Sequence, residues 1–146
     1  MKISLVIGMI VILITGCASQ GTGDLFRAVK SCDLDLAKRA IANGANVNEK
    51  LTKYGDPALL EISTIVNCTD DKKIELAKLL ISNGADVNAK DYFLGYTLLL
   101  STYTDRELAK LLISNGADVN AKDKYGKTIL HHIVSYEPIS VNYDKD

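Results

Sequence analysis

The stretch LAKLLISNGADVNAK occupies residues 76–90 and recurs without change at residues 108–122. A third version, LAKRAIANGANVNEK, occupies residues 36–50. In each copy, apolar residues recur at helical spacing and are followed by Asn-Gly-Ala, where the glycine favours the end of a helix. Segments that recur at this spacing are stacked structural units that cannot bury their apolar faces alone. The chain is therefore predicted to be a repeat protein.

The segment between two copies carries a second motif, best seen in DKYGKTILH at residues 123–131. It resembles the ankyrin repeat, in which Asp-x-x-Gly-x-Thr-Pro-Leu-His opens a helix pair that ends in Gly-Ala-Asp-Val-Asn; only the proline is replaced. The resemblance covers roughly residues 24–134 and implies an all-α solenoid of stacked helix pairs with hairpin-like fingers and an incomplete last repeat. The implied repeats are about residues 24–50, 51–90, 91–122 and 123–146.

Capping residues indicate where the helices begin and end. We expect helices over residues 25–31, 34–42, 57–67, 73–82 and 128–135. Asp24 and Asp33 are good N-caps, and Pro57 suits the first turn of a helix. After Pro138 no second helix follows in the last repeat, so residues 139–143 either cover its open face or leave a contact surface there.

The N-terminus has the pattern of a bacterial leader. Lys2 precedes an apolar run over residues 3–14, which has the length of a signal-peptide core. Residues 13–17, Leu-Ile-Thr-Gly-Cys, resemble the bacterial lipobox, in which the cysteine is diacylated and becomes the mature N-terminus. This predicts a lipoprotein signal peptide over residues 1–16, lipidation of Cys17 and a short linker over residues 17–23; the alternatives are an uncleaved anchor or a chance match.

Acyl chains on Cys17 would tether the repeats to a membrane, because each buried methylene contributes about 0.8 kcal/mol. The resemblance to enteric-type lipoproteins favours the outer membrane, facing the periplasm, because Ala18 rather than aspartate follows the cysteine. The linker spans only about 20 Å at roughly 3.5 Å per residue. The repeat domain, residues 24–146, is thus expected close to the bilayer of a cell envelope.

Two further cysteines, Cys32 and Cys68, fall in the links between the two helices of the first and second repeats. Equivalent turns of neighbouring repeats lie side by side, and an oxidising compartment permits disulfides. We expect a Cys32–Cys68 disulfide that joins these repeats; the alternative is two unpaired thiols. No metal site is expected, because neither cysteine has a histidine at ligand spacing.

Composition and motifs argue against several functions. With 17 basic and 18 acidic residues, the chain has no electrostatic footprint for nucleic acid. No phosphate-binding glycine loop or metal-ligand cluster is evident, so we expect no catalysis, cofactor or small-molecule substrate. Of the two histidines, His131 falls at the family's turn position and, like His132, is expected to be structural. Asp86 and Asp118 are turn residues of the family motif.

The aromatic residues gather in or beside the expected fingers, which ankyrin proteins use, with the first helix of each pair, to bind partner proteins. Tyrosine is a typical hot-spot residue on such edges. We expect Tyr54 and Tyr125 to be exposed and Phe93 to be more buried; alternatively some tyrosines only pack between fingers. The predicted partner-binding residues are Tyr54, Asp56, Tyr92, Phe93, Tyr96, Lys124, Tyr125 and Lys127, with Lys53, Glu61 and Ser101 beside them.

The sequence thus predicts a non-enzymatic, lipid-anchored envelope protein that binds a partner protein. A sharper hypothesis is neutralisation of an envelope-acting toxin, such as a phospholipase or peptidoglycan hydrolase, because small envelope lipoproteins with repeat folds resemble immunity proteins. Two alternatives are a scaffold for a resident envelope enzyme or stress system, and an enzyme or ligand receptor with an unrecognised site.

Overall fold

The computed structural model describes residues 21–50, 55–102 and 105–136, in which every regular element is helical. Residues 21–30 are helical and pair with α2. The remaining elements are α2 (Leu34–Ala42), α3 (Ala58–Glu61) continued by a 3₁₀ turn η1 (Ile62–Thr64), α4 (Asp70–Ser82), α5 (Leu98–Ser101), α6 (Arg106–Ser114) and α7 (Ile129–Tyr136).

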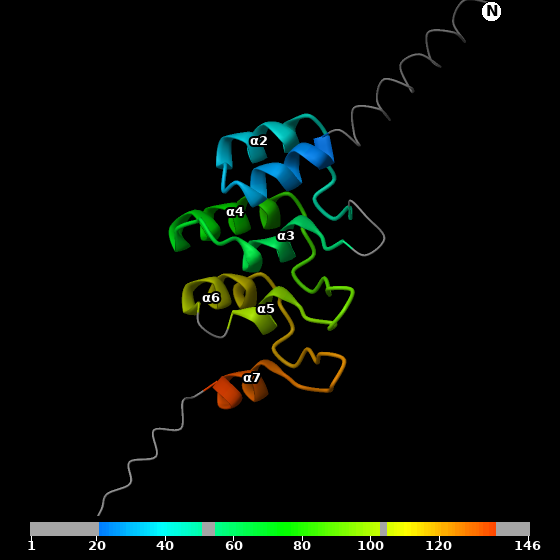
Figure 1. Cartoon of the computed structure of the whole chain (residues 1–146), viewed down its shortest axis with the longest axis vertical. Helices are drawn as coiled ribbons and strands as arrows, with labels where there is room; N and C mark the ends of the chain where they lie inside the picture. Colours follow the sequence, from blue (N-terminus) through cyan, green and yellow to red (C-terminus); the bar gives the residue numbers. More distant parts are fainter. Residues whose placement is uncertain (1–20, 51–54, 103–104, 137–146) are drawn as a thin grey trace, which may run out of the picture.

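The helices stack as pairs, with α3 beside α4, α5 beside α6 and α7 alone at the C-terminal end of the stack (Figure 1). The helices α2, α4 and α6 pack on one another in sequence and form one layer, while α5 packs on α7 in the other. Between repeats the chain leaves the helices as fingers, here defined by the described residues 43–50 with 55–57, 83–97 and 115–128. The all-α solenoid predicted from the sequence is confirmed.

The core is built by the leucines that the repeated segment places at helical spacing. Leu76 and Leu80 of α4 are fully buried, and their counterparts Leu108 and Leu112 of α6 are buried as well. They face α3 and α5, whose side chains Leu59, Leu98 and Leu99 are almost completely enclosed. Identical sequence in two successive repeats thus produces the same buried face, and each repeat covers its neighbour.

Side-chain caps and glycines fix the ends of the helices in the α2, α4 and α6 layer, here called the outer helices. Asp33 accepts a hydrogen bond from the Leu36 N–H at 2.9 Å, as predicted for the N-cap of α2, and Asp105 does the same for α6. Just after the C-terminal end of α4, Gly84 adopts φ +86°, a left-handed conformation that other residues adopt only at an energetic cost. This turn directs the chain from each outer helix into the following finger.

Several predicted helix boundaries are wrong. Residues 21–23, predicted as the end of the linker, already belong to the first helix. Asp24 is therefore not an N-cap, and its carboxylate pairs instead with Arg27 at 3.0 Å. Pro57 is the N-cap rather than part of the first turn. The helix that follows ends with η1 at Thr64 instead of Asn67, because Ile65 is extended and the Thr64 hydroxyl donates back to a helix carbonyl.

Two other helices begin at residues different from those predicted. The helix α4 begins at Asp70 rather than at residue 73, and Asp70 and Asp71 complement the positive end of its dipole. The last helix, α7, begins one residue later than predicted, at Ile129.

A disulfide joins Cys32 to Cys68, the pair predicted from the sequence, with a Cα–Cα distance of 5.6 Å. Cys32 lies in the tight turn before α2, and Cys68 lies in the link before α4. Cys32 has φ +56°, so it occupies a left-handed position at which glycine is favoured. The bond therefore ties the first helix pair to the second at the turns opposite the fingers.

Some predictions concern residues that the structure does not describe. The signal peptide over residues 1–16, the lipidation of Cys17, the linker up to residue 20, the side chains of Lys53 and Tyr54, and the segment 139–143 lie outside the described residues. Within residues 21–50, 55–102 and 105–136, no helix has both the length and the apolar character needed to cross a bilayer.

Candidate protein-binding surface

Adjacent fingers are joined by the asparagine of each Val-Asn motif. Asn48 Nδ2 donates to the Gly84 carbonyl at 2.8 Å, and Asn48 Oδ1 accepts from the Asp86 N–H at 2.8 Å. Asn88 makes the same two bonds to the glycine carbonyl and aspartate N–H of the third finger, at 3.1 and 2.8 Å. The three fingers are therefore linked into one continuous edge, a role for these asparagines that the sequence did not reveal.

An aspartate holds the turn at the tip of each of the last two fingers. Asp123 Oδ1 accepts from the N–H groups of Tyr125 and Lys127 at 2.8 and 2.9 Å, and Asp123 N–H donates to the Lys127 carbonyl at 3.0 Å. In the second finger, Asp91 Oδ1 accepts from Leu94 and Gly95. The first donor is thus Leu94, three residues after Asp91, whereas in the third finger it is Tyr125, two residues after Asp123. The extra residue of the second finger accounts for this shift.

The Asp123 carboxylate also anchors the third finger to α7. Its side chain is fully buried, and its Oδ2 lies 3.1 Å from His132 Nε2. Burial acts to raise the pKa of Asp123, but hydrogen bonds from the Lys127 and Tyr125 backbone and from His132 hold that pKa below its ordinary value. Tyr96 of the second finger packs edge-on against the His132 ring, with centroids 5.2 Å apart. His132 is thus structural, as expected.

Three aromatic side chains project from these tips, and we call Tyr92, Phe93 and Tyr125 the aromatic finger tips. They are 51%, 67% and 68% exposed. Tyr92 and Phe93 form an edge-to-face pair with centroids 5.3 Å apart. The prediction that Phe93 is buried is wrong, because the turn held by Asp91 directs both consecutive rings outward.

Lys124 connects the two tips. Its Nζ donates to the Phe93 carbonyl at 2.8 Å and lies 5.1 Å from the centre of the Tyr125 ring, within range of a cation–π interaction. Its N–H donates to the Leu94 carbonyl at 2.9 Å. The structure therefore brings Tyr92, Phe93, Lys124 and Tyr125 together as one fixed patch.

Other predicted contact residues have supporting positions. Asp56 Oδ1 accepts from the Tyr92 N–H at 3.3 Å and so links the first finger to the second. Tyr96 is half-buried against His132, whereas Lys127 is exposed beside the patch. Glu61 lies 3.7 Å from Lys30. Asp56 and Tyr96 therefore support the finger edge, whereas Glu61 lies on α3 and pairs with the first helix.

The sequence profile of ankyrin repeats, in three copies, matches residues 25–123 and 65–142. The chain belongs to the ankyrin-repeat family. No curated protein matches it. Ankyrin repeats commonly mediate protein–protein interaction and are typically not enzymes, which agrees with a surface of fixed, exposed aromatic rings.

In the last repeat both the threonine and the histidine of the ankyrin turn motif are present. There, His131 Nδ1 lies 2.8 Å from Thr128 Oγ1 and accepts from the Thr128 N–H at 3.2 Å, which confirms the structural role predicted for His131. In the preceding repeat, Thr97 corresponds to Thr128, but Leu100 stands where the histidine would be. The Thr97 hydroxyl is consequently buried without a hydrogen-bond partner among the described residues.

The turn aspartates of the ankyrin motif also behave as predicted. Asp86 and Asp118 accept hydrogen bonds from the N–H groups of Asn88 and Asn120, each at 2.9 Å. These bonds are local to each turn, so the two carboxylates act as finger supports. Within the described ranges, no group of three or more histidine, cysteine, aspartate or glutamate side chains could hold a metal ion.

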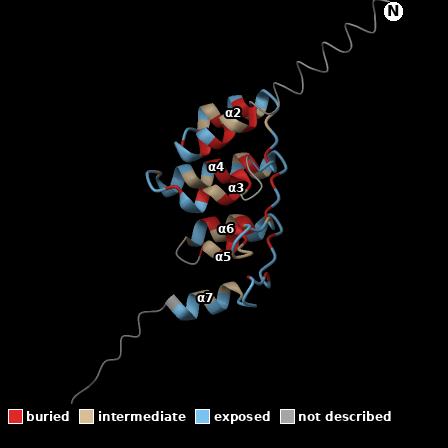
Figure 2. Ribbon diagram, turned by 45° about the vertical axis from the view of Figure 1, so that its right-hand side comes forward, coloured by how far each residue is buried: buried red, intermediate tan, exposed pale blue. Residues whose placement is uncertain are grey.

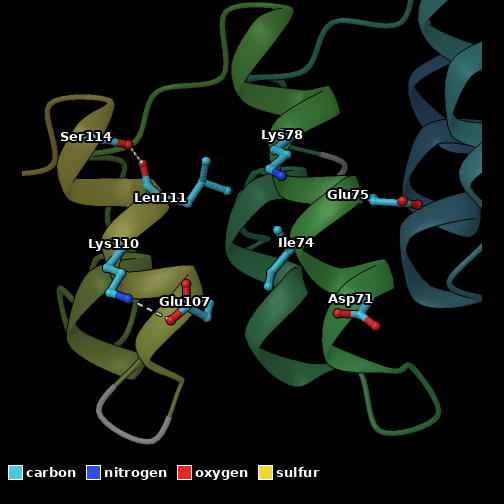
Figure 3. Close-up of a pocket in the computed structure, with 8 residues that line it drawn as sticks. All are labelled: Asp71, Ile74, Glu75, Lys78, Glu107, Lys110, Leu111 and Ser114. Carbon is cyan, nitrogen blue, oxygen red and sulfur yellow. Dashed lines mark hydrogen bonds and ion pairs between the residues drawn. The ribbon is translucent and has the colours of Figure 1, made fainter.

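Apart from the finger edge, the ankyrin stack has a groove of about 670 Å³ between α4 and α6 (Figure 3). Its lining residues are Asp71, Ile74, Glu75, Lys78, Glu107, Lys110, Leu111 and Ser114. Lys110 Nζ lies 2.8 Å from Glu107, and this hydrogen bond and the charge of Lys110 lower the pKa of Glu107. Three carboxylates and two lysines leave the groove with about one negative charge, and its lining lacks aromatic side chains.

The C-terminal end of the ankyrin stack exposes apolar side chains, because α7 has no outer helix beside it among the described residues (Figure 2). Leu130, Ile133 and Val134 are 69%, 39% and 76% exposed. The segment predicted to cover this face, residues 139–143, lies outside the described residues. The choice between a covered end and a contact surface therefore stays a prediction.

Proposed function

We propose that this chain binds a partner protein through the edge of its second and third fingers, with the aromatic finger tips as the main contacts. The observation that carries this proposal is the cluster of three exposed aromatic rings, Tyr92, Phe93 and Tyr125, on adjacent fingers. Large aromatic side chains that become buried at an interface account for much of its binding energy.

The fingers hold these rings in place before any partner arrives. The Asp91 and Asp123 turns, the bridge made by Lys124 and the asparagine bonds between fingers all fix backbone at or near the tips. A rigid surface loses less conformational entropy on binding than a flexible loop of the same composition. This favours a dedicated binding edge over exposed aromatic residues that only pack between fingers.

We propose further that the protein is tethered to a cell envelope by acyl chains on Cys17. The support is the lipobox-like Leu-Ile-Thr-Gly-Cys at residues 13–17 after an apolar leader. The chain is helical from residue 21, so a linker of three residues, about 10 Å at roughly 3.5 Å per residue, would then keep the finger edge close to the outer membrane, on its periplasmic side. Replacing Cys17 by serine should abolish incorporation of radiolabelled palmitate and release the chain from the membrane fraction; retained label would refute the tether.

Within that setting we propose that the partner is an envelope-acting toxin, such as a phospholipase or peptidoglycan hydrolase, which the finger edge neutralises. This role would follow from the proposed membrane tether together with the exposed aromatic finger tips, and it rests on the resemblance to small envelope lipoproteins that act as immunity proteins. The alternatives, a scaffold for a resident envelope enzyme or a receptor for a ligand, predict a different captured partner.

Capture from detergent-solubilised envelopes tests the binding function and separates the roles. The bait is the full chain, compared with a finger variant carrying Tyr92→Ser, Phe93→Ser and Tyr125→Ser. The control is a groove variant carrying Lys78→Ser and Glu75→Ser on α4, which retains the aromatic finger tips. Mass spectrometry should find a protein held by the wild type and the groove variant but not by the finger variant. A partner that the finger variant captures equally well would refute the proposed edge.

The identity of the captured protein then distinguishes the roles. A stoichiometric hydrolase whose activity falls on binding supports neutralisation. A resident envelope protein with unchanged activity supports a scaffold and contradicts the neutralising role.

A further inference from the structure

A cavity of about 500 Å³ lies between the second and third fingers, apart from the aromatic finger tips. The second finger contributes Asn88, Lys90 and Thr97, and the third contributes Asp118, Asn120 and Lys122. Thr97 is only 2% exposed, whereas both lysines are exposed. The lysines therefore lie toward the solvent side of the cavity, and Thr97 belongs to its buried wall.

The charge of this cavity is positive overall. Lys90 Nζ donates to the Lys122 carbonyl at 3.1 Å, and neither lysine forms an ion pair with a carboxylate of the described residues. Asp118 supplies the single acidic group, and its Oδ1 already accepts from the Asn120 N–H. Two ammonium groups and one carboxylate leave about one positive charge, which favours a singly charged anion.

Two polar groups of the wall lack the partners that their counterparts have. The Thr97 hydroxyl is buried and unpartnered, because Leu100 replaces the histidine that pairs with Thr128 in the next repeat. The Asn120 side chain, unlike those of Asn48 and Asn88, makes no hydrogen bond to a following finger within the described part of the chain. The Thr97 Oγ1 is enclosed by protein atoms and so lies out of reach of a ligand, whereas the Asn120 amide is exposed and free to donate to one.

We propose that this cavity binds a carboxylate group of the partner protein, either an aspartate or glutamate side chain or a free C-terminus. The two lysines supply charge-assisted hydrogen bonds, and the Asn120 amide supplies a neutral donor. A phosphate dianion fits less well, because its second charge would face Asp118. This inference rests on the proposed function: the carboxylate fixes the partner's register while the aromatic finger tips provide apolar contact.

A titration followed by amide NMR signals tests the site with the full chain in its naturally processed form, kept in detergent micelles. The probes are a capped five-residue peptide with a central glutamate, its glutamine counterpart, a capped glycine peptide with a free C-terminus, acetate and inorganic phosphate. The glutamate peptide should shift the Lys90, Thr97, Asn120 and Lys122 signals saturably. The glutamine peptide should bind about tenfold more weakly, because it lacks the charge.

Substitutions of the lining residues test whether the glutamate peptide binds in the cavity. Lys122→Gln and Lys90→Gln should each weaken binding of the glutamate peptide about fivefold to tenfold. Lys50→Gln is the matched control, since Lys50 holds the same motif position in the first repeat and does not line the cavity. Asn120→Ala should weaken binding without changing the thermal unfolding of the chain, which separates loss of a donor from loss of fold.

Three outcomes overturn the proposal, and a fourth identifies the source of the carboxylate. Equal binding of the two capped peptides would show that charge is not recognised, and absence of saturable shifts would show that there is no site. Acetate or phosphate binding as tightly as the peptides would identify a pocket for small anions instead. If the free C-terminus binds more tightly than the glutamate side chain, the source of the carboxylate is a chain end. The finger variant retains Lys90 and Lys122, so its loss of partner capture does not depend on this site. If the wild-type chain captures a partner but binds none of the carboxylate probes, only the carboxylate site is rejected.

Discussion

Removing the disulfide by replacing Cys32 and Cys68 with serine should destabilise the protein by about 4 kcal/mol. The bonded cysteines are 36 residues apart in sequence. In the chain-entropy description, closing a loop of that length lowers the entropy of the unfolded chain by about 13 cal/mol/K, which corresponds to roughly 3.8 kcal/mol at room temperature. The loss is large against the total stability of a small domain, about 5 to 15 kcal/mol.

The backbone at Cys32 adds a second, independent expectation. Its φ of +56° is a left-handed conformation that costs an L-residue roughly 1–2 kcal/mol and glycine almost nothing. Without the disulfide, serine at position 32 still bears this cost. The pair Cys32→Gly with Cys68→Ser should therefore be more stable than the double-serine variant by about 1 kcal/mol.

Urea unfolding of the full chain, followed by circular dichroism and extrapolated linearly to water, measures both differences. Wild-type protein treated with reductant is the control and should match the double-serine variant to within about 0.5 kcal/mol. A loss below about 1 kcal/mol, or two reactive thiols in unreduced wild-type protein, would contradict the role assigned to the bond.

Five further substitutions test the finger supports and the turn motif. The pKa of Asp123 in the folded protein is lowered from the ordinary value of about 3.8, so the ionised carboxylate stabilises the fold above that pH. This contribution is lost as the pH falls through the lower folded pKa. In acid titrations, the stability advantage of wild type over Asp123→Asn should therefore be constant at neutral pH and shrink below about pH 4. Asn88→Ala removes two bonds between fingers and should cost about 1–3 kcal/mol in urea unfolding, whereas Asn120→Ala should cost almost nothing. Thr97→Val removes an unpartnered hydroxyl and should leave the melting temperature unchanged or slightly higher, but Thr128→Val, which loses the contact to His131, should lower stability by about 1 kcal/mol.

The fold was predictable because its determinants are local and repeated. Leu76 and Leu80 recur at helical spacing before Gly84, and the same pattern in the next repeat gives the same buried face. The Cys32–Cys68 pairing also followed from the register, since equivalent turns of stacked repeats lie side by side. Consistency between local pattern and repeat register makes such inferences reliable.

The finger tips were less predictable, because their side-chain directions depend on individual turn bonds. Phe93 was expected to be buried, yet the Asp91 turn, with one residue more than the Asp123 turn, directs it outward. The contact of Asp123 with His132 depends on how α7 meets the finger, and spacing alone does not reveal that geometry. The unpartnered Thr97 was visible in principle, because Leu100 replaces the motif histidine, but its burial became evident only in three dimensions.

The most direct test of the binding edge is the affinity of the captured partner for the finger variant, measured by calorimetry beside the groove variant. Loss of the Tyr92, Phe93 and Tyr125 rings should weaken the complex by about 2–4 kcal/mol, roughly 30-fold to 1,000-fold, with unchanged helix content. The groove variant should bind within about threefold of wild type. An unchanged affinity of the finger variant, together with weakened binding by the groove variant, would contradict the finger edge and move the interface to the outer helices α4 and α6.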